Sequence, residues 1–382
     1  MNPKDFEDPR TGKLVPTTNG CMAFIPAPLP PENLDLESLV PLIARATRAL
    51  GELSGVGRTL PNPYLLIRPF MRKEAAASSK IEGTVTTLSE LLLFEADEQT
   101  SRAPSDAREV LNYVRALEHA LKRLDELPIS RRLIQEAHSI LMLRVASHRG
   151  ARITPGEFRR DQNWIGARLI ENARFVPPPT QEVDGAISDL EKYINNKDDL
   201  LPMVIKMALV HYQFETIHPF PDGNGRVGRM LMPLMLCESK ELSQPLLYLS
   251  SYLEKNYDTY IDRMFAVSTR GRWEEWIGFF LSGLAETCMD AIAKAQALQD
   301  LQNQYLGRIQ QARSSALLAK IIGMIFESPA VTIPSISSGL GISYNSAKKH
   351  VARLEEHEIL FDSAYGRPKI WFAREVVDLV NK

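Results

Sequence analysis

The chain has 382 residues, with 45 Lys and Arg against 47 Asp and Glu, so its formal net charge is −2. Hydrophobic residues make up 44% of the sequence and charged residues 24%, ordinary globular proportions that exclude global disorder. The near-zero net charge excludes a general electrostatic attraction to nucleic acid or to anionic membranes. At roughly 150 residues per domain, the length predicts two or three domains.

The three cysteines, Cys21, Cys237 and Cys288, are far apart and form no CxxC pair, which supports neither a disulfide framework nor a zinc ribbon. The N-terminus mixes charges with prolines and lacks the apolar core of a secretory signal. The best candidate for a membrane span, the apolar run Met230–Cys237, is far shorter than the roughly 20 residues that cross a bilayer. We therefore expect a cytoplasmic protein without a membrane partner.

Residues 1–105 predict an arm followed by helices. Residues 1–33 are rich in Pro, Gly and Asn and favour an extended arm over a helix. Leu, Val and Ile then repeat at helical spacing over residues 34–50. A second helix should start after Pro63 and end at Gly83, a residue that commonly terminates helices.

Residues 106–290 predict a helical core with one interruption. Residues 158–179 carry aromatic and β-branched residues and end in three prolines, so we expect a short β-hairpin or flap there. Residues 271–284 predict an amphipathic helix whose Trp273, Trp276 and Phe280 face the core. The expected fold class is therefore mainly α, with a small β-hairpin flap.

The C-terminal quarter predicts a separate module. Residues 291–313 are rich in Ala and Gln and predict a helical linker. Residues 314–382 then show two helices around Gly341 and two strands within 361–372, with a tip at Gly366–Pro368. This order is typical of a winged-helix-like domain.

Residues 211–232, HYQFETIHPFPDGNGRVGRMLM, carry the chemistry. A helix over 203–217 should end near His218, because Pro219 disfavours the α conformation in the residue before it. A new helix should begin near Gly225. The turn between the two helices therefore brings polar side chains and glycines to one place.

Each residue type in this turn suits one part of a phosphate-transfer site. Gly223–Gly225 can direct backbone N–H groups at an anion from a helix N-terminus. Arg226 and Arg229 are three apart and suit phosphate oxygens, while Asp222 could hold Mg²⁺, which prefers one or two carboxylates plus phosphate oxygens. His218, at the helix end, could reach a hydroxyl near that phosphate. Together within twelve residues, these features predict a nucleotide-dependent active site.

A rival metal interpretation uses His211, Glu215 and His218, which share a helix face at spacings of four and three. A di-iron carboxylate bundle needs two Glu-x-x-His motifs on different helices, and only one is present. No HExxH zinc motif occurs either. Redox and zinc chemistry are therefore not favoured.

The stretch from His218 to Arg229 resembles the signature HxFx(D/E)GNGRxxR of the Fic (filamentation induced by cAMP) family at every fixed position. Two further segments, Trp164–Gly166 and Phe175–Pro178, resemble the family's flap, which registers the target segment beside the histidine. Ser78–Gly83, SSKIEG, resembles the family's inhibitory motif (S/T)xxxE(G/N). The resemblance covers roughly residues 20–290 and implies a Fic catalytic core over 106–290.

The resemblance implies a protein adenylyltransferase, which transfers AMP from ATP to a Ser, Thr or Tyr hydroxyl of a target protein and releases pyrophosphate. His218 would be the general base and Asp222 the Mg²⁺ ligand, and Phe220 would anchor the loop without a chemical role. The implied nucleotide-binding residues are Glu82, Gly223, Asn224, Gly225, Arg226, Val227, Gly228, Arg229 and Tyr260.

The position of Glu82 implies that the enzyme is regulated by inhibition. Ser78 and Glu82 are four apart and share a helix face. In the family, this carboxylate pairs with the arginine that corresponds to Arg229 and competes with the γ-phosphate of ATP. We therefore expect an autoinhibited enzyme that becomes active when the helix carrying Glu82 is displaced.

The C-terminal module also permits a function of a different class. Its second helix offers a basic cluster of Lys348, Lys349, His350 and Arg353, which would suit a winged-helix transcriptional regulator that binds DNA. However, residues 314–382 hold eight Lys and Arg against seven Asp and Glu, so protein interaction or dimerisation is favoured. Within the Fic family, removal of AMP and transfer of a different phosphate-containing group both stay open. We expect a homodimer, and the chain itself is a candidate target.

Overall fold

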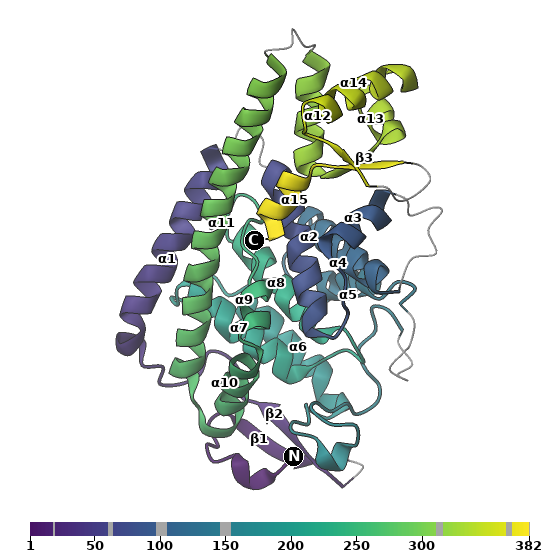
Figure 1. The fold of residues 1–382 in the computed structure, drawn as a ribbon. Helices are drawn as coiled ribbons and strands as arrows, with labels where there is room; N and C mark the ends of the chain where they lie inside the picture. The colour runs from purple at the N-terminus through teal and green to yellow at the C-terminus, as the bar shows by residue number, and fades with distance from the viewer. Residues whose placement is uncertain are drawn as a thin grey trace.

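The computed structural model describes residues 1–17, 20–59, 64–96, 105–145, 154–310, 316–363 and 369–381. Helices dominate these residues, as the sequence predicts (Figure 1). The helices before the C-terminal module are α1 (Leu36–Thr59), α2 (Tyr64–Ile81), α3 (Leu88–Ala96), α4 (Ser105–Arg123), α5 (Arg131–Leu141), α6 (Thr180–Ile194), α7 (Met203–Ile217), α8 (Asn224–Glu238), α9 (Ser250–Lys255), α10 (Tyr257–Arg270) and α11 (Trp273–Gln310).

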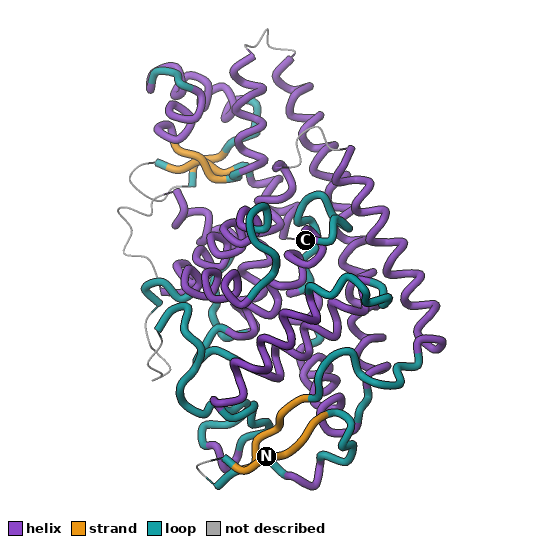
Figure 2. Tube along the Cα trace, turned by 180° about the vertical axis from the view of Figure 1, so that it is seen from behind, coloured by secondary structure: helices purple, strands orange, loops and turns teal. Residues whose placement is uncertain are grey.

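The N-terminal arm is extended, as expected, but it is paired. A short 3₁₀ turn, η1 (Pro3–Asp5), precedes strands β1 (Gly12–Pro16) and β2 (Met22–Pro26), which form an antiparallel hairpin. The Phe24 N–H of β2 donates to the Val176 carbonyl, so the hairpin packs against residues 158–179. Figures 1 and 2 show this hairpin at one end of the molecule, with the strands of the C-terminal module toward the opposite end.

The predicted hairpin or flap over residues 158–179 is present in a reduced form. The segment contains a single isolated antiparallel bridge, Ile165 with Phe175, and the 3₁₀ turn η2 (Ile170–Asn172) between them. Pro177–Pro179 have no backbone N–H to donate, so a regular ladder cannot continue past the bridge. The flap is therefore irregular, and the N-terminal hairpin contacts it through the Phe24–Val176 hydrogen bond.

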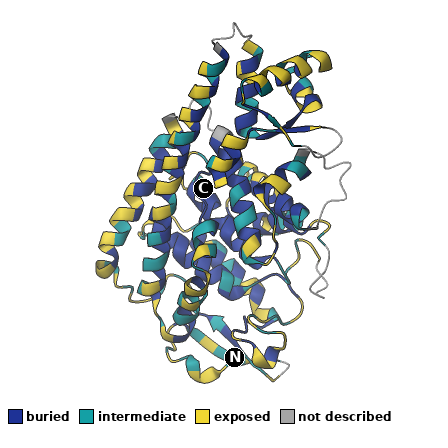
Figure 3. Ribbon diagram, viewed as in Figure 1, coloured by how far each residue is buried: buried dark blue, intermediate teal, exposed yellow. Residues whose placement is uncertain are grey.

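Helices α7 and α8 lie at the centre of the core. Nearly every residue of α7 is buried, so this helix is covered on all sides and shows no amphipathic stripe (Figure 3). The predicted aromatic core of α11 is confirmed: Trp276 and Phe280 are fully buried, and Trp276 Nε1 donates to the Ala208 carbonyl of α7 at 3.0 Å. The three cysteines are all free.

Helix α11 is continuous across the predicted core–linker boundary at residue 290. It packs along α1, and Figure 1 shows the two long helices side by side. Within the described part of the chain, α11 is the one helix long and apolar enough to cross a membrane by length and composition. Half of its most apolar window is buried inside this structure. Buried core helices share these properties.

The C-terminal module follows residues 311–315, which lie outside the described residues. Its elements are α12 (Ala316–Glu327), β3 (Ala330–Thr332), α13 (Ile333–Leu340), α14 (Tyr344–Glu356), β4 (Phe361–Asp362), β5 (Ile370–Phe372) and α15 (Arg374–Asn381). The two predicted helices and the two predicted strands are present, and β3 joins them in an antiparallel sheet of order β3-β5-β4. The predicted helix start after Pro63 is confirmed, since α2 begins at Tyr64. The predicted tip at Gly366–Pro368 lies outside the described residues, and the winged-helix assignment stays a prediction.

Candidate active site

The turn between α7 and α8 forms as the sequence predicts. Helix α7 ends at Ile217, and His218 follows in a left-handed conformation with φ 49°. Gly223, with φ 79°, precedes the first residue of α8. A left-handed backbone is costly for a residue with a side chain, and such strain concentrates at functional sites. The strained residue here is the predicted general base.

Asn224 holds the loop through both ends of its side-chain amide. Its Oδ1 accepts from the Phe220 N–H and its Nδ2 donates to the Phe220 carbonyl, both at 2.8 Å. The Phe220 ring is fully buried and stacks on His138 with 3.7 Å between ring centroids. The side chain of Asn224 is thus used to brace the loop, while the N-terminal backbone of α8 faces the cavity.

Three residues that the sequence analysis did not single out also hold this loop. Buried His138 of α5 accepts from the Gly156 N–H through Nδ1 and donates to the Asp222 carbonyl through Nε2 at 3.0 Å. Arg159 Nε and Asn163 Nδ2 both donate to the His218 carbonyl, at 2.9 and 3.3 Å. Local spacing could not identify these residues, because the loop residue that each one contacts lies 55 or more positions away in the chain.

His218 is arranged as a neutral base. Its Nδ1 lies 3.2 Å from the Glu215 carbonyl, which can only accept, so the ring proton resides on Nδ1 and the lone pair on Nε2. Burial lowers the pKa of His218 to about 4, so the ring is uncharged at neutral pH. The imidazole can therefore take a proton from a bound hydroxyl.

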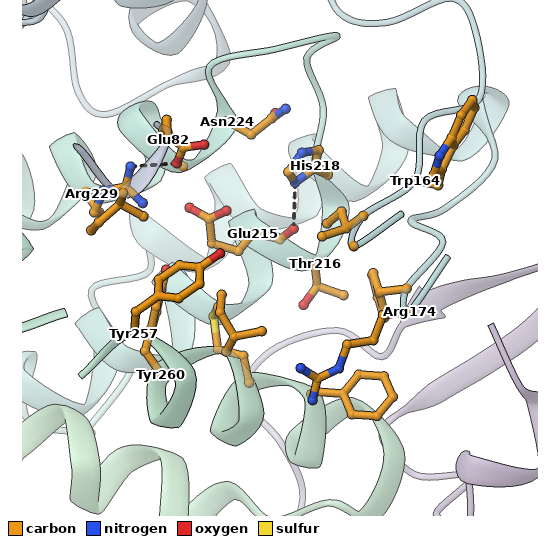
Figure 4. A pocket seen from close by; sticks show the side chains of 18 of the residues that line it. Glu82, Trp164, Arg174, Glu215, Thr216, His218, Asn224, Arg229, Tyr257 and Tyr260 are labelled. Carbon is orange, nitrogen blue, oxygen red and sulfur yellow. Dashed lines mark hydrogen bonds and ion pairs between the residues drawn. The ribbon is translucent and has the colours of Figure 1, made fainter. Parts of the chain in front are cut away.

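Arg229 and Glu82 meet at the opposite side of the same cavity (Figure 4). Arg229 Nη2 lies 2.7 Å from Glu82 Oε1, and Nε donates to Ser78 Oγ at 2.8 Å. Arg229 also donates to the Ser78 carbonyl, so all these partners come from α2 or the residue that follows it. Burial by itself raises the pKa of Glu82, but Arg229 outweighs it and holds that pKa below its usual value.

Three residues of the predicted nucleotide site do not line the cavity. Arg226 turns into the core, where Nη1 pairs with Glu109 Oε2 of α4 at 3.1 Å. Val227 is buried in the core, and a Cβ on Gly228 would come within 2.3 Å of Glu215 Oε1, so glycine here permits close packing of α7 on α8. These side chains support the site instead of facing the ligand space.

The cavity has a volume of about 400 Å³, within the range of small-ligand pockets. It lies between the end of α2, the flap, the α7–α8 turn and α10. The predicted residues that line it are Glu82, His218, Asp222, Gly223, Asn224, Gly225, Arg229 and Tyr260. The flap adds Trp164 and Arg174, and Arg174 Nη2 pairs with Asp262 of α10 at 2.6 Å.

Glu215 and Tyr260 complete the buried wall. Burial raises the pKa of Glu215 to about 8; Arg229 partly offsets this rise and Glu82 adds to it, so this side chain is mostly protonated at pH 7. Tyr260 Oη lies 2.8 Å from His211 Nε2. His211 Nδ1 lies 3.2 Å from the Gly228 carbonyl and therefore carries the proton, so Tyr260 donates to Nε2.

The rival metal interpretation receives no support from this geometry. Both ring nitrogens of His211 are hydrogen-bonded, which leaves no lone pair for a metal. No group of three or more His, Cys, Asp or Glu side chains among the described residues could hold a metal ion. Asp222 presents one carboxylate to the cavity, and its Oδ1 accepts from the Gly223 N–H. A single carboxylate fits Mg²⁺ when phosphate oxygens and water supply the remaining ligands.

Comparison with known proteins identifies the family. The profile described as "Fic/DOC family N-terminal" matches residues 40–122, and the one described as "Fic/DOC family" matches residues 128–236. The two matches together span half of the chain. The chain therefore belongs to the Fic/DOC family.

Relatives and solved structures agree with this membership. The chain is 42% identical over 71 residues to a probable protein adenylyltransferase of Aquifex aeolicus, covering 19% of this chain and 22% of the relative. It is 34% identical over 107 residues to the protein adenylyltransferase Fic of Aedes aegypti, covering 28% of this chain and 20% of the relative. The match thus spans about a fifth of these relatives' length.

The fold is also shared with crystal structures of family members. A Fic family protein from Desulfovibrio desulfuricans superposes with a TM-score of 0.55 at 19% identity, covering 87% of this chain and 96% of that one. A Fic domain containing signaling protein from Bacteroides thetaiotaomicron gives a TM-score of 0.53 at 22% identity, covering 67% and 97%. At these identities the likeness concerns the fold.

Proposed function

We propose that the protein is an adenylyltransferase that transfers AMP from ATP to a Ser, Thr or Tyr hydroxyl of a target protein. The observation that carries this proposal is the pairing, in one cavity, of a neutral His218 with the N-terminus of α8. A base and an anion site side by side suit attack of a hydroxyl on a phosphate. The matched relatives, which are named protein adenylyltransferases, support the same reaction.

In this reaction His218 Nε2 takes the hydroxyl proton as the oxygen attacks the α-phosphorus. The new oxygen–phosphorus bond forms as the bond to the β-phosphate oxygen breaks, and pyrophosphate leaves. Backbone N–H groups of Asn224 and Gly225 stabilise charge on the transferred group, since they are fixed before the reaction, while the Gly223 N–H is held by Asp222 Oδ1. Asp222 would hold Mg²⁺, which would neutralise phosphate charge.

Autoinhibition is the second part of the proposal. Arg229 is almost completely buried, and Glu82 occupies the side of its guanidinium that faces the cavity. A γ-phosphate therefore competes with a carboxylate already in place. Displacing the end of α2 would free Arg229 to orient ATP.

Mass spectrometry tests the reaction directly. Full-length Glu82→Gly protein is incubated with ATP, Mg²⁺ and cell lysate, and peptides of the chain and of lysate proteins are searched for an added AMP group. We expect the modification on Ser, Thr or Tyr, and its disappearance in the Glu82→Gly, His218→Ala double variant. Absence of AMP-modified peptides from every sample would contradict the proposal.

A further inference from the structure

The chain that directly follows the inhibitory glutamate is anchored by contacts of its own. Helix α2 ends at Ile81, and Gly83 follows in a left-handed conformation with φ 86°. The Thr84 N–H donates to the Ser79 carbonyl at 3.0 Å, a bond typical of a helix end with glycine at this position. The glycine therefore redirects the chain, and Thr84 leaves α2 toward α4.

The Thr84 hydroxyl is bonded to a carboxylate that also holds an arginine of α8. Thr84 Oγ1 donates to Glu109 Oε2 of α4 at 3.0 Å. The same oxygen accepts from Arg226 Nη1 at 3.1 Å. All three side chains are buried, so water competes little for these hydrogen bonds. Glu109 thus links the chain after Glu82 to the first turn of α8.

A backbone contact attaches the next residue to the same helix. The Val85 N–H donates to Asp106 Oδ2 at 3.2 Å. Asp106 and Glu109 are three apart on α4, and residues at this spacing share a helix face. Helix α4 in turn contacts α8. Two successive residues after Gly83 are therefore fixed to a helix that packs on the candidate active site.

The two arginines at the start of α8 consequently hold one short segment at two points. Arg229 binds Glu82 directly, at 2.7 Å. Arg226 reaches Thr84 through Glu109. Because a single residue separates Glu82 from Thr84, Glu82 cannot move away from Arg229 without disturbing the Thr84 contact. The second point of attachment therefore opposes release of the first.

We propose that Thr84 is a positioning residue that keeps Glu82 in its inhibitory place through the hydrogen bond to Glu109. The inference rests on the proposed function, since Glu82 inhibits only if the freed Arg229 orients ATP. It places part of the strength of inhibition in a residue outside the inhibitory motif Ser78–Gly83. It also gives Glu109, on α4, a part in regulation.

Transfer of label from α-labelled ATP in the full chain tests the role of the hydroxyl. Thr84→Val keeps the branched shape and removes the hydroxyl, and Thr84→Ser keeps the hydroxyl. Thr84→Val should raise transfer by about three- to tenfold, the equivalent of one lost hydrogen bond, and stay below Glu82→Gly. Thr84→Ser should match the wild type. So should the control Thr86→Val, because Thr86 lies two residues further on and is less buried.

A double variant shows whether Thr84 acts through Glu82. Transfer by Glu82→Gly, Thr84→Val should equal that of Glu82→Gly, because no inhibitory carboxylate is left to position. Wild-type activity of Thr84→Val beside a raised activity of Glu82→Gly would overturn the proposal, as would an equal rise in both backgrounds. Thr84→Ala, which also lacks the hydroxyl, should behave like Thr84→Val. Circular dichroism melts establish that each variant is folded at the assay temperature.

Hydrogen exchange tests the anchoring without depending on AMP transfer. The amides of residues 82–84 donate to the carbonyls of Ser79 and Lys80 at the end of α2. They should exchange faster in Thr84→Val than in the wild type and in Thr84→Ser. Unchanged exchange in Thr84→Val would refute the anchoring role. Faster exchange without AMP transfer in any variant would count against the proposed function and leave the anchoring role in place.

Discussion

Replacing Glu82 with Gly should raise AMP transfer by about 10- to 100-fold. The carboxylate makes one charge-assisted hydrogen bond to Arg229 at 2.7 Å, and such bonds contribute about 1.5–3 kcal/mol. In the wild type, ATP must displace this contact before the guanidinium can orient the γ-phosphate. Because each 1.4 kcal/mol changes a rate by about tenfold, removing this contact gives the expected rise of about 10- to 100-fold. Arg229 keeps both bonds to Ser78 and stays oriented.

The assay is transfer of label from α-labelled ATP to protein, measured as kcat/KM for ATP. Glu356→Gly serves as the control, because it removes an exposed carboxylate from the end of α14, away from the cavity. The control should match the wild type, and Glu82→Gln should fall between wild type and Gly. Equal activity of wild type and Glu82→Gly would refute the assignment of Glu82 as an inhibitor.

Three further predictions follow from the same cavity. The kcat/KM of Glu82→Gly should stay level from about pH 7.5 to about pH 5.5, because burial lowers the pKa of His218 to about 4; a decline that begins near pH 6.5 would contradict this. The pKa of Glu215 is raised to about 8 in the folded protein, so its contribution to the free energy of unfolding is lost as the pH rises through 8. The wild-type melting temperature should therefore fall more than that of Glu215→Gln between about pH 5 and about pH 9. Parallel pH dependence of the two proteins would refute a neutral Glu215. Chelating Mg²⁺ should abolish transfer, and Asp222→Asn should raise the Mg²⁺ concentration needed for half-maximal rate; full activity with chelator would exclude the metal role.

Local sequence rules were sufficient to predict the backbone conformation of the turn between α7 and α8. Pro219 ends α7, and Gly223 supplies the left-handed residue before α8, so the turn could be placed within a residue. The predicted flap is present beside His218, but it holds one bridge instead of a regular ladder, because its three prolines remove ladder donors. Steric rules of this kind depend only on neighbours in the chain.

The sequence could not predict which side chains line the cavity and which enter the core; the three-dimensional structure was needed. Arg226 and Arg229 are three apart and were assigned one role, yet Arg226 pairs with Glu109, which is 117 positions away. The same limit applies to His138, whose partner Asp222 is 84 positions away. Helical spacing gives the direction in which a side chain leaves the backbone, but a distant partner decides whether it enters the core or the cavity.

The most direct test of the proposed function compares α- and γ-labelled ATP with the Glu82→Gly protein. AMP transfer with His218 as base predicts protein labelling from the α position, none from the γ position, release of pyrophosphate, and loss of labelling in the Glu82→Gly, His218→Ala double variant. Labelling from the γ position, or α labelling that survives the loss of His218, would contradict it.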